Sequence, residues 1–241
     1  MGIQAKLKKM AEELGADFFG IANLSPAQEV IEKHWEKVTA QFPRAISFGI
    51  ALPHDIVNQQ PKRFSSNVAL NYHHHAYNII NQRLDHIASR LSSAIQKEGN
   101  RSLPIPATQE SIYNEELYGI FSHKMAARFS GLGWIGKCCL LVTPSVGPRA
   151  RWGSVLTDAS LKPTKKPMKD NWGDCHECVD ICPTKAFTGE SFREEEDPRE
   201  IRYNAHKCNK YLSKLEKTSA LGVCGMCLYV CPYGRNKINN S

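Results

Sequence analysis

The sequence predicts a mixed α/β (α+β) chain with two domains, 1–162 and 163–241. Up to about residue 160, segments with the periodicity of helices alternate with segments typical of strands. Residues 161–170 then carry four lysines, two prolines and little apolar bulk, which is typical of a linker or an exposed loop. Seven of the nine cysteines lie in the last 67 residues. We therefore expect a packed first domain and a small second domain organised by its cysteines.

The first elements follow from apolar spacing and from capping residues. Residues 3–15 place their apolar side chains on one helical face, and Gly15 can end that helix. A serine–proline pair at 25–26 opens a second helix, which is expected to run to about residue 40. Strands are predicted over 17–22 and over 45–52, and the second of these is expected to be buried.

The later elements of the first domain begin with a long helix over 68–98, because apolar residues recur along one face. Three consecutive histidines, 73–75, lie on this helix and face different directions, so they are not expected to chelate one metal. Pro104 and Pro106 interrupt the chain after it. The remaining expected elements are a helix over 112–129 and strands over 138–143 and 152–157.

Composition and charge exclude several classes of protein. Apolar residues make up 41% and charged residues 23%, which excludes disordered, collagen-like and coiled-coil chains. No apolar run approaches the roughly 20 residues of a membrane span, and the amphipathic start lacks the apolar core of a signal peptide. We therefore expect a cytoplasmic protein with reduced cysteines and no membrane partner. The net charge of +7 suits tRNA, an acidic redox partner or an anionic cofactor alike.

Two copies of one cysteine motif dominate the second domain. Cys175, Cys178 and Cys182 have the spacing C-x2-C-x3-C-P, and Cys224, Cys227 and Cys231 repeat it. This spacing is part of the bacterial ferredoxin run C-x2-C-x2-C-x3-C-P, in which the last cysteine ligates the other cluster. The two copies therefore predict two iron–sulfur clusters with crossed ligation. A zinc ribbon built on the two C-x2-C pairs is the alternative, but it gives three of these cysteines no role.

One cysteine of the full run is missing, because Trp172 stands at its position. Crossed ligation gives one cluster a complete set, namely Cys182, Cys208, Cys224 and Cys227. The other cluster receives only Cys175, Cys178 and Cys231. Its fourth position is left open between Asp174, His176, Cys138 or Cys139, solvent, and a three-iron cluster that lacks the fourth iron.

A glycine-rich loop lies between the predicted helix and strand near residue 130. Gly131, Gly133 and Gly136 match G-x-G-x-x-G, but a helix precedes them and a strand follows, which is the reverse of the dinucleotide-binding order. The loop is either a plain helix-to-strand turn or a close approach to a bulky cofactor beside Trp134 and Lys137. Ser122, His123 and Lys124 lead into this loop and are either site residues or a solvated helix end.

Taken together, these motifs resemble the epoxyqueuosine reductase family, corrinoid-dependent iron–sulfur reductases that are distantly similar to reductive dehalogenases. The resemblance lies in GLGWIGKCCLLVT followed by the two cysteine motifs, and in AEELGADFFGIANL, FPRAISFGIAL, PIPATQ and RARWGSVLTD. It implies a nitroreductase-like domain that binds cobalamin, followed by a small ferredoxin-like domain with two [4Fe–4S] clusters. It also implies that the seven clustered cysteines ligate iron. The cofactor-binding residues that it implies lie in the loop and are Gly131, Gly133, Trp134, Gly136 and Lys137. Ser122 and Lys124 are further candidates for cofactor binding, because they lead into this loop.

The chain is expected to be a short and divergent member of that family. It ends ten residues after Cys231, where the family continues into a tRNA-binding helical region, so tRNA is not the expected substrate. The family's catalytic aspartate falls at Glu116 in this sequence. We expect an oxidoreductase that takes low-potential electrons from a ferredoxin or flavodoxin and passes them through two clusters to a corrinoid. The corrinoid would then reduce a small substrate, with Glu116 or His123 as the acid. The alternatives are a corrinoid-handling or electron-transfer protein without an organic substrate, and a flavin-dependent reductase.

Overall fold

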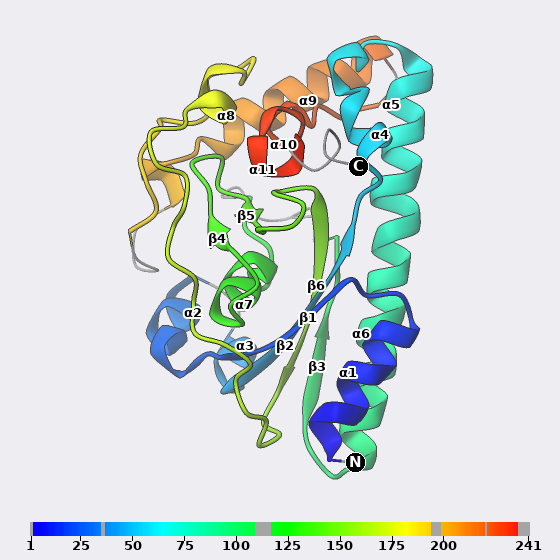
Figure 1. The fold of residues 1–241 in the computed structure, drawn as a ribbon, viewed down its shortest axis with the longest axis vertical. Coiled ribbons are helices and arrows are strands. Elements are labelled where there is room, and N and C mark those ends of the chain that lie inside the picture. Colours follow the sequence, from blue (N-terminus) through cyan, green and yellow to red (C-terminus); the bar gives the residue numbers. More distant parts are fainter. Residues whose placement is uncertain (1, 35–36, 109–116, 194–198, 220, 236–241) are drawn as a thin grey trace. The chain divides into compact units, whose positions relative to one another are not determined.

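The computed structural model describes residues 2–34, 37–108, 117–193, 199–219 and 221–235 (Figure 1). Two compact units are present, each built from three chain segments. The sheet unit comprises Met1–Ile50, Ile80–Gly133 and Arg151–Met168, and the cysteine unit comprises Ala51–Ile79, Trp134–Ala150 and Lys169–Ser241. These units are defined by packing, whereas the predicted domains 1–162 and 163–241 are stretches of sequence expected to bind different cofactors. The boundary near residue 162 therefore stays a prediction. Helices and strands occur together, which confirms the predicted mixed class.

A four-stranded sheet with the order β1-β2-β6-β3 forms the centre of the sheet unit. β1 (Phe18–Asn23) pairs antiparallel with β2 (Arg44–Ala51), and β3 (Ser102–Ile105) pairs antiparallel with β6 (Ala150–Thr157). Six consecutive residues of β2 are buried, so this strand is covered on both faces. This burial on both faces explains why apolar residues run continuously through the strand, as the sequence predicted.

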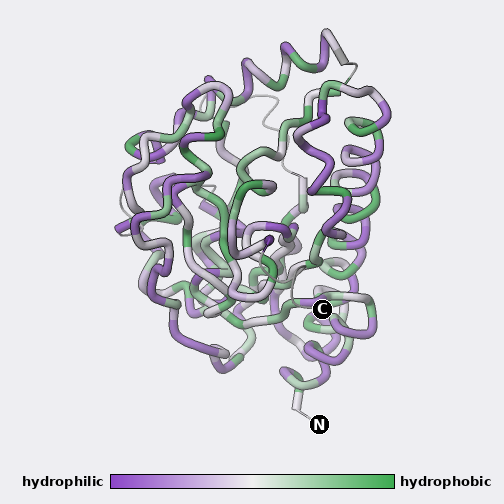
Figure 2. The backbone as a smooth tube through the Cα atoms, turned by 45° about the horizontal axis from the view of Figure 1, so that its top comes forward, coloured by the Kyte–Doolittle hydropathy of each residue, from purple (hydrophilic) through white to green (hydrophobic). Residues whose placement is uncertain are grey.

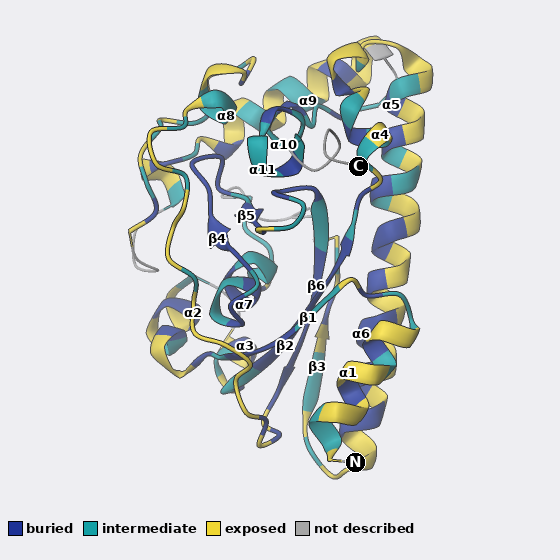
Figure 3. Cartoon of the chain, in the orientation of Figure 1, coloured by how far each residue is buried: buried dark blue, intermediate teal, exposed yellow. Residues whose placement is uncertain are grey.

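Helices cover both faces of this sheet (Figure 1). α1 (Ile3–Glu13) packs on α6 (Ile80–Lys97), which packs on β3, and α7 (His123–Phe129) packs on β1. The remaining helices of the unit are η1 (Ser25–Ala27), α2 (Gln28–His34) and α3 (Lys37–Ala40). Hydrophobic and hydrophilic positions alternate along the long helix (Figure 2), and its apolar face is buried (Figure 3). The main core contains Leu24, Ile31, Phe42, Phe121, Met125 and Leu156.

Three sequence-based predictions about these elements need correction. Pro104 does not break the chain but lies in β3, where an edge strand tolerates the missing N–H. Of the helix predicted over 112–129, only α7 is helical among the described residues, and Leu117 has a left-handed φ of 57°. The predicted strand over 138–143 shrinks to β5 (Leu141–Val142), since the residues before it form a turn.

The cysteine unit is made of short elements. Its helices are α4 (His54–Asn58), η2 (Gln60–Lys62), α5 (Ser66–His73), the π-helix η3 (His74–Ile79), α8 (Glu177–Asp180), η4 (Arg199–Ile201), α9 (Ala205–Ser219), α10 (Met226–Val230) and α11 (Pro232–Arg235). β4 (Trp134–Ile135) and β5 form a hairpin, and α10 packs on α8, α11 and α4. No helix in the described ranges has both the length and the apolar character needed to cross a membrane.

Candidate metal centre

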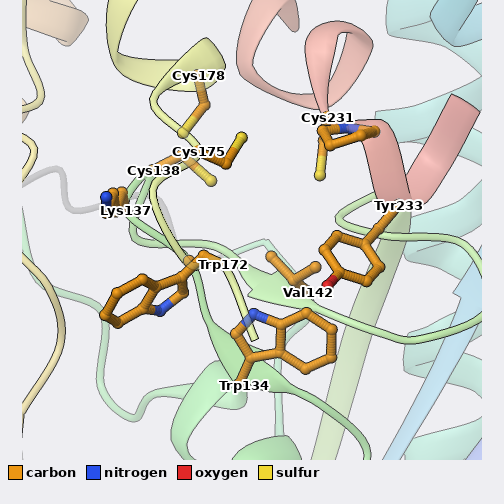
Figure 4. A pocket seen from close by; sticks show the side chains of 11 residues that line it. Trp134, Lys137, Cys138, Val142, Trp172, Cys175, Cys178, Cys231 and Tyr233 are labelled. Atoms are coloured by element: carbon orange, nitrogen blue, oxygen red, sulfur yellow. The ribbon is translucent and has the colours of Figure 1, made fainter. Parts of the chain in front are cut away.

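A pocket in the cysteine unit is lined by four cysteine side chains (Figure 4). Cys175 and Cys178 come from the loop before α8 and from α8 itself, and Cys231 follows α10. Cys138 comes from the turn of the β4–β5 hairpin. In Figure 4, Cys138, Cys175 and Cys178 lie together, and Cys231 faces them across the pocket. The structure therefore brings together the three cysteines of the incomplete set and adds a fourth sulfur.

The thiols of Cys138 and Cys178 form a hydrogen bond. This bond, together with burial, raises the pKa of Cys138 well above its usual range. The same bond is the main cause that lowers the pKa of Cys178. The two sulfur atoms therefore lie close enough to influence each other's ionisation, and the thiolate is the form of cysteine that binds metal.

The complete set of cysteines forms a second, adjoining group. Burial raises the pKa of Cys227, and the nearby Cys224, Cys208 and Cys182 raise it further. Burial likewise raises the pKa of Cys224 and of Cys208, and both lie within electrostatic range of Cys182. These are the four side chains that crossed ligation assigns to one cluster. Cys178 also acts on Cys227, so the two groups of sulfur atoms are neighbours.

Burial disfavours the thiolate form of these cysteines unless a nearby cation compensates the negative charge. It raises the pKa of Cys231 to about 11, even though the backbone N–H groups of Tyr233 and Gly234 favour the thiolate. At Cys182, hydrogen bonds from the Thr184 hydroxyl and from nearby backbone N–H groups outweigh burial, so its pKa is lowered. Bound iron would offset the cost of the buried thiolates, which links cluster binding to folding.

Two tryptophans line the pocket with unpaired indole donors. Nε1 of Trp134 and Nε1 of Trp172 are buried and have no hydrogen-bond partner among the described residues. Buried donors are normally satisfied, and sulfur atoms of an iron–sulfur cluster accept such bonds. The Trp134 ring also packs edge-on against Tyr233, with 4.9 Å between ring centroids. These residues fit the aromatic cover and the donors that a cluster needs.

A buried cation, Arg149, lies beside this pocket. Its Nη1 donates to Asn58 Oδ1 at 2.9 Å and to His54 Nδ1 at 3.2 Å, and its Nη2 donates to the Tyr229 carbonyl at 3.1 Å. Burial lowers the pKa of Arg149, while the neighbouring Cys231 thiol raises it. All three of these partners are neutral, so the guanidinium charge is well placed to compensate an anionic cluster. Arg149 could not be identified from the sequence, because its burial depends on distant segments of the chain.

Lys137 belongs to the same pocket and is also buried. Its Nζ donates to His176 Nε2 at 2.9 Å and to the Gly173 carbonyl at 3.3 Å, and it lies 5.1 Å from the Trp172 ring centroid. Among the described residues, no three His, Cys, Asp or Glu side chains lie close enough together to hold a single metal ion. A multi-iron cluster does not require that convergence, because each ligand binds a separate iron.

The glycine loop is used for the protein's own packing. A Cβ on Gly131, which has a φ of 70°, would lie 2.5 Å from Lys165 Cβ and 2.6 Å from the Lys166 carbonyl oxygen. A Cβ on Gly136 would lie 2.9 Å from Val142 Cγ2. α7 precedes Gly131, β4 lies between Gly133 and Gly136, and β5 follows the loop, which confirms the helix-then-strand order that argued against dinucleotide binding. Gly133 is buried, and the predicted cofactor role of the loop stays a prediction.

The residues that lead into the loop are engaged in local structure. The Ser122 hydroxyl caps α7 by accepting from the Met125 N–H at 3.2 Å. The His123 Nε2–H donates to the Pro106 carbonyl at 2.9 Å, so Nδ1 accepts from the Ser154 hydroxyl at 2.9 Å. Burial lowers the pKa of His123 to about 4, which keeps the ring neutral. Lys124 is half-buried, and Glu116 lies outside the described residues. Catalytic roles for His123 and Glu116 stay predictions.

Comparison with known proteins identifies the cysteine-rich region. Residues 172–234 match the family model described as a 4Fe-4S double cluster binding domain. The predicted pair of iron–sulfur clusters is thereby confirmed, in preference to a zinc ribbon.

Sequence relatives extend the resemblance beyond the clusters. Epoxyqueuosine reductase from Listeria monocytogenes is 31% identical over 127 residues, which are 48% of this chain and 31% of the relative. The Pseudomonas aeruginosa enzyme is 28% identical over 187 residues, which are 72% of this chain and 45% of the relative. These matches confirm the predicted resemblance to the epoxyqueuosine reductase family. The chain spans less than half the length of either relative.

Solved structures agree on the fold. A catabolic reductive dehalogenase, NpRdhA, has a TM-score of 0.69 at 20% identity, with 95% of this chain and 31% of that chain covered. Epoxyqueuosine reductase from Streptococcus thermophilus has a TM-score of 0.60 at 20% identity, with 98% of this chain and 67% of that chain covered. The fold is therefore the one that the sequence resemblance predicts.

Proposed function

We propose that this epoxyqueuosine reductase-like chain is an iron–sulfur oxidoreductase that passes low-potential electrons through two clusters to a bound corrinoid, for the reduction of a small substrate. The observation that carries the proposal is the division of eight cysteines into two adjoining groups of four. One group is Cys182, Cys208, Cys224 and Cys227, and the other lines the pocket. Neighbouring clusters can exchange single electrons, whereas a purely structural metal site has no need of two adjoining groups.

The chain's own residues adapt this site to electron transfer. Trp134, Trp172 and Tyr233 cover the pocket and limit the access of water, which helps set a cluster's potential. Arg149 and the two indole N–H groups favour the more negative, reduced cluster. We propose a ferredoxin or flavodoxin as the electron donor, because these proteins work at low potential.

The corrinoid part of the proposal rests on the relatives. One reductive dehalogenase structure, with a TM-score of 0.67, is described as suggesting a mechanism for B12-dependent dehalogenation. A corrinoid would supply a strongly reducing cobalt centre. At Gly131 and Gly136 the protein's own atoms fill the space that a Cβ would occupy, so packing alone explains these two glycines and they are not evidence for the corrinoid.

Anaerobic loading with cobalamin tests the proposal. The protein is purified without oxygen, its iron and cobalt are counted, and added cobalamin is followed by absorbance under a titanium(III) reductant. We expect about eight irons per chain and cobalamin that stays bound through gel filtration. Protein-bound cobalamin should be reduced faster than free cobalamin, and only when the clusters are present. Chelator-treated protein is the control.

The outcomes of this experiment separate the candidate functions. Substrate consumption would then be sought among small halogenated or epoxide compounds and with an epoxyqueuosine tRNA stem-loop. Reduction of cobalamin without any organic product would indicate a corrinoid-handling protein. Isoalloxazine absorbance and no cobalamin binding would indicate a flavin reductase. Failure to retain any cobalamin would overturn the corrinoid part of the proposal.

A further inference from the structure

We propose that Cys138 is the fourth protein ligand of the cluster held by Cys175, Cys178 and Cys231. The inference rests on the two-cluster part of the proposed function. In this arrangement Cys138, from a separate part of the chain, takes the place of the cysteine that is missing at position 172 of the ferredoxin run. Both clusters would then have four cysteine ligands.

The pocket itself is the first support for this ligand. Cys138 lines the same pocket as the three other cysteines, and its sulfur lies beside those of Cys175 and Cys178 (Figure 4). Its thiol is hydrogen-bonded to that of Cys178. The sulfur is therefore already among the predicted ligands and does not need a chain movement to reach them.

The hairpin turn holds Cys138 in that position. Trp134 pairs with Val142 and Ile135 with Leu141, and the turn is closed by two backbone hydrogen bonds. The Gly136 N–H donates to the Leu140 carbonyl at 2.9 Å, and the Cys139 N–H donates to the Gly136 carbonyl at 2.8 Å. A turn fixed in this way presents its side chain with little loss of conformational freedom on binding.

The other protein candidates for the fourth position fit less well. Asp174 and His176 are exposed, and neither lines the pocket. His176 Nε2 accepts a hydrogen bond from Lys137, which occupies one of its two ring nitrogens. Cys139 is buried but does not line the pocket, and its left-handed φ of 55° turns the chain there.

Ligation by Cys138 is a substitution reaction without a change of oxidation state. The thiol loses its proton to water, and its sulfur forms a bond to the fourth iron in place of a solvent ligand. Trp172 stands at the position where the ferredoxin run has a cysteine, and its indole covers the pocket. Because Cys138 and Trp172 have exchanged the usual roles of ligand and cover, a cysteine restored at 172 should compensate for the loss of Cys138.

Three variants test the inference in the full-length, anaerobically purified protein. Cys138→Ala removes the proposed ligand, and Cys139→Ala is the matched control from the neighbouring buried cysteine. The double variant Cys138→Ala with Trp172→Cys rebuilds the ferredoxin run. Iron and sulfide are counted, and EPR spectra are recorded before and after reduction.

We expect the wild type and Cys139→Ala to hold about eight irons without an oxidised three-iron signal. Cys138→Ala should fall to about seven irons with a three-iron signal, or to about four irons if the whole cluster is lost. The double variant should recover about eight irons. Such recovery is not expected if Cys138→Ala loses iron only because it misfolds.

Three results would overturn the inference. The first is that Cys138→Ala still holds about eight irons. The second is a three-iron signal that is already present in the wild type. The third is equal iron loss in the two single variants without recovery in the double variant. Wild-type protein with little iron would instead refute the two-cluster function itself, so the two failures are distinguishable.

Discussion

At the scale of single residues, Arg149 offers the sharpest test of electrostatics. Its buried guanidinium has three neutral hydrogen-bond partners and lies beside Cys231. Arg149→Met should make the potential of the adjoining cluster more negative by roughly 60 mV, the equivalent of about 1.4 kcal/mol for one electron. Arg149→Lys retains the charge and should shift the potential much less. An EPR-monitored redox titration measures both, and equal shifts would show that packing rather than charge is responsible.

Tyr203 should tune the other cluster through a hydrogen bond. Its hydroxyl donates to the Cys208 sulfur, and this bond lowers the pKa of Cys208 against the larger effect of burial. Tyr203→Phe removes a donor that favours the reduced cluster, so the potential should fall by about 20–60 mV. Tyr77→Phe is the control, because the Tyr77 ring packs against Tyr72 and His73 rather than against a cysteine. An unchanged potential in Tyr203→Phe would contradict this role.

His123 should make stability depend on pH. Its pKa in the folded protein is about 4, below the ordinary value of 6.5, because burial disfavours the charged ring. The unfolded chain therefore binds the extra proton first, so the stabilisation is complete above pH 6.5 and is lost as the pH falls toward 4. In His123→Asn, the melting temperature should fall less steeply over this range than in the wild type. His206→Asn, at an exposed position, is the control, and parallel curves for all three proteins would refute the effect.

At the scale of elements, Gly131 separates a structural role for the glycine loop from a cofactor role. Its positive φ and the 2.5 Å approach of Lys165 Cβ leave no room for a side chain. Gly131→Ala should therefore destabilise the protein by about 1–3 kcal/mol even without any cofactor. Gly99→Ala is a useful control, since it also has a positive φ but no atom within 4 Å of the added Cβ. Denaturant unfolding measures both, and an unaffected Gly131→Ala would favour a loop that serves only a ligand.

The elements that could be predicted from the sequence are those fixed by local chemistry. Apolar spacing gave α1 and α6, a continuous apolar run gave β2, and cysteine spacing gave the two cluster motifs. Pro104 was misjudged because its tolerance depends on β3 being an edge strand. The sequence left Cys138 as one of several candidates for the fourth ligand, because only the turn of the β4–β5 hairpin brings it to a motif that begins 37 residues later, at Cys175. Tertiary pairing, rather than local sequence, decides such contacts.

At the scale of the whole molecule, the two compact units should respond differently to the loss of iron. The sheet unit has an apolar core formed by strands and helices, in which Leu24, Ile31 and Leu156 are fully or almost fully buried. The cysteine unit is built of short elements, and even its longest helix, α9, buries only Ala205 and Leu215 among its described residues. Bound clusters must therefore contribute more to the stability of the cysteine unit.

Hydrogen exchange followed by mass spectrometry can measure this difference. After chelation of iron under anaerobic and reducing conditions, amide protection should fall by at least about tenfold in α8, α9 and α10, which corresponds to about 1.4 kcal/mol of opening free energy. Protection of α6 and β2 should change much less, because their apolar packing does not involve metal. The protein incubated without chelator is the control. Equal loss of protection in both units would show that the chain unfolds as one cooperative body, and no loss in α8–α10 would show that the cysteine unit is stable without its clusters.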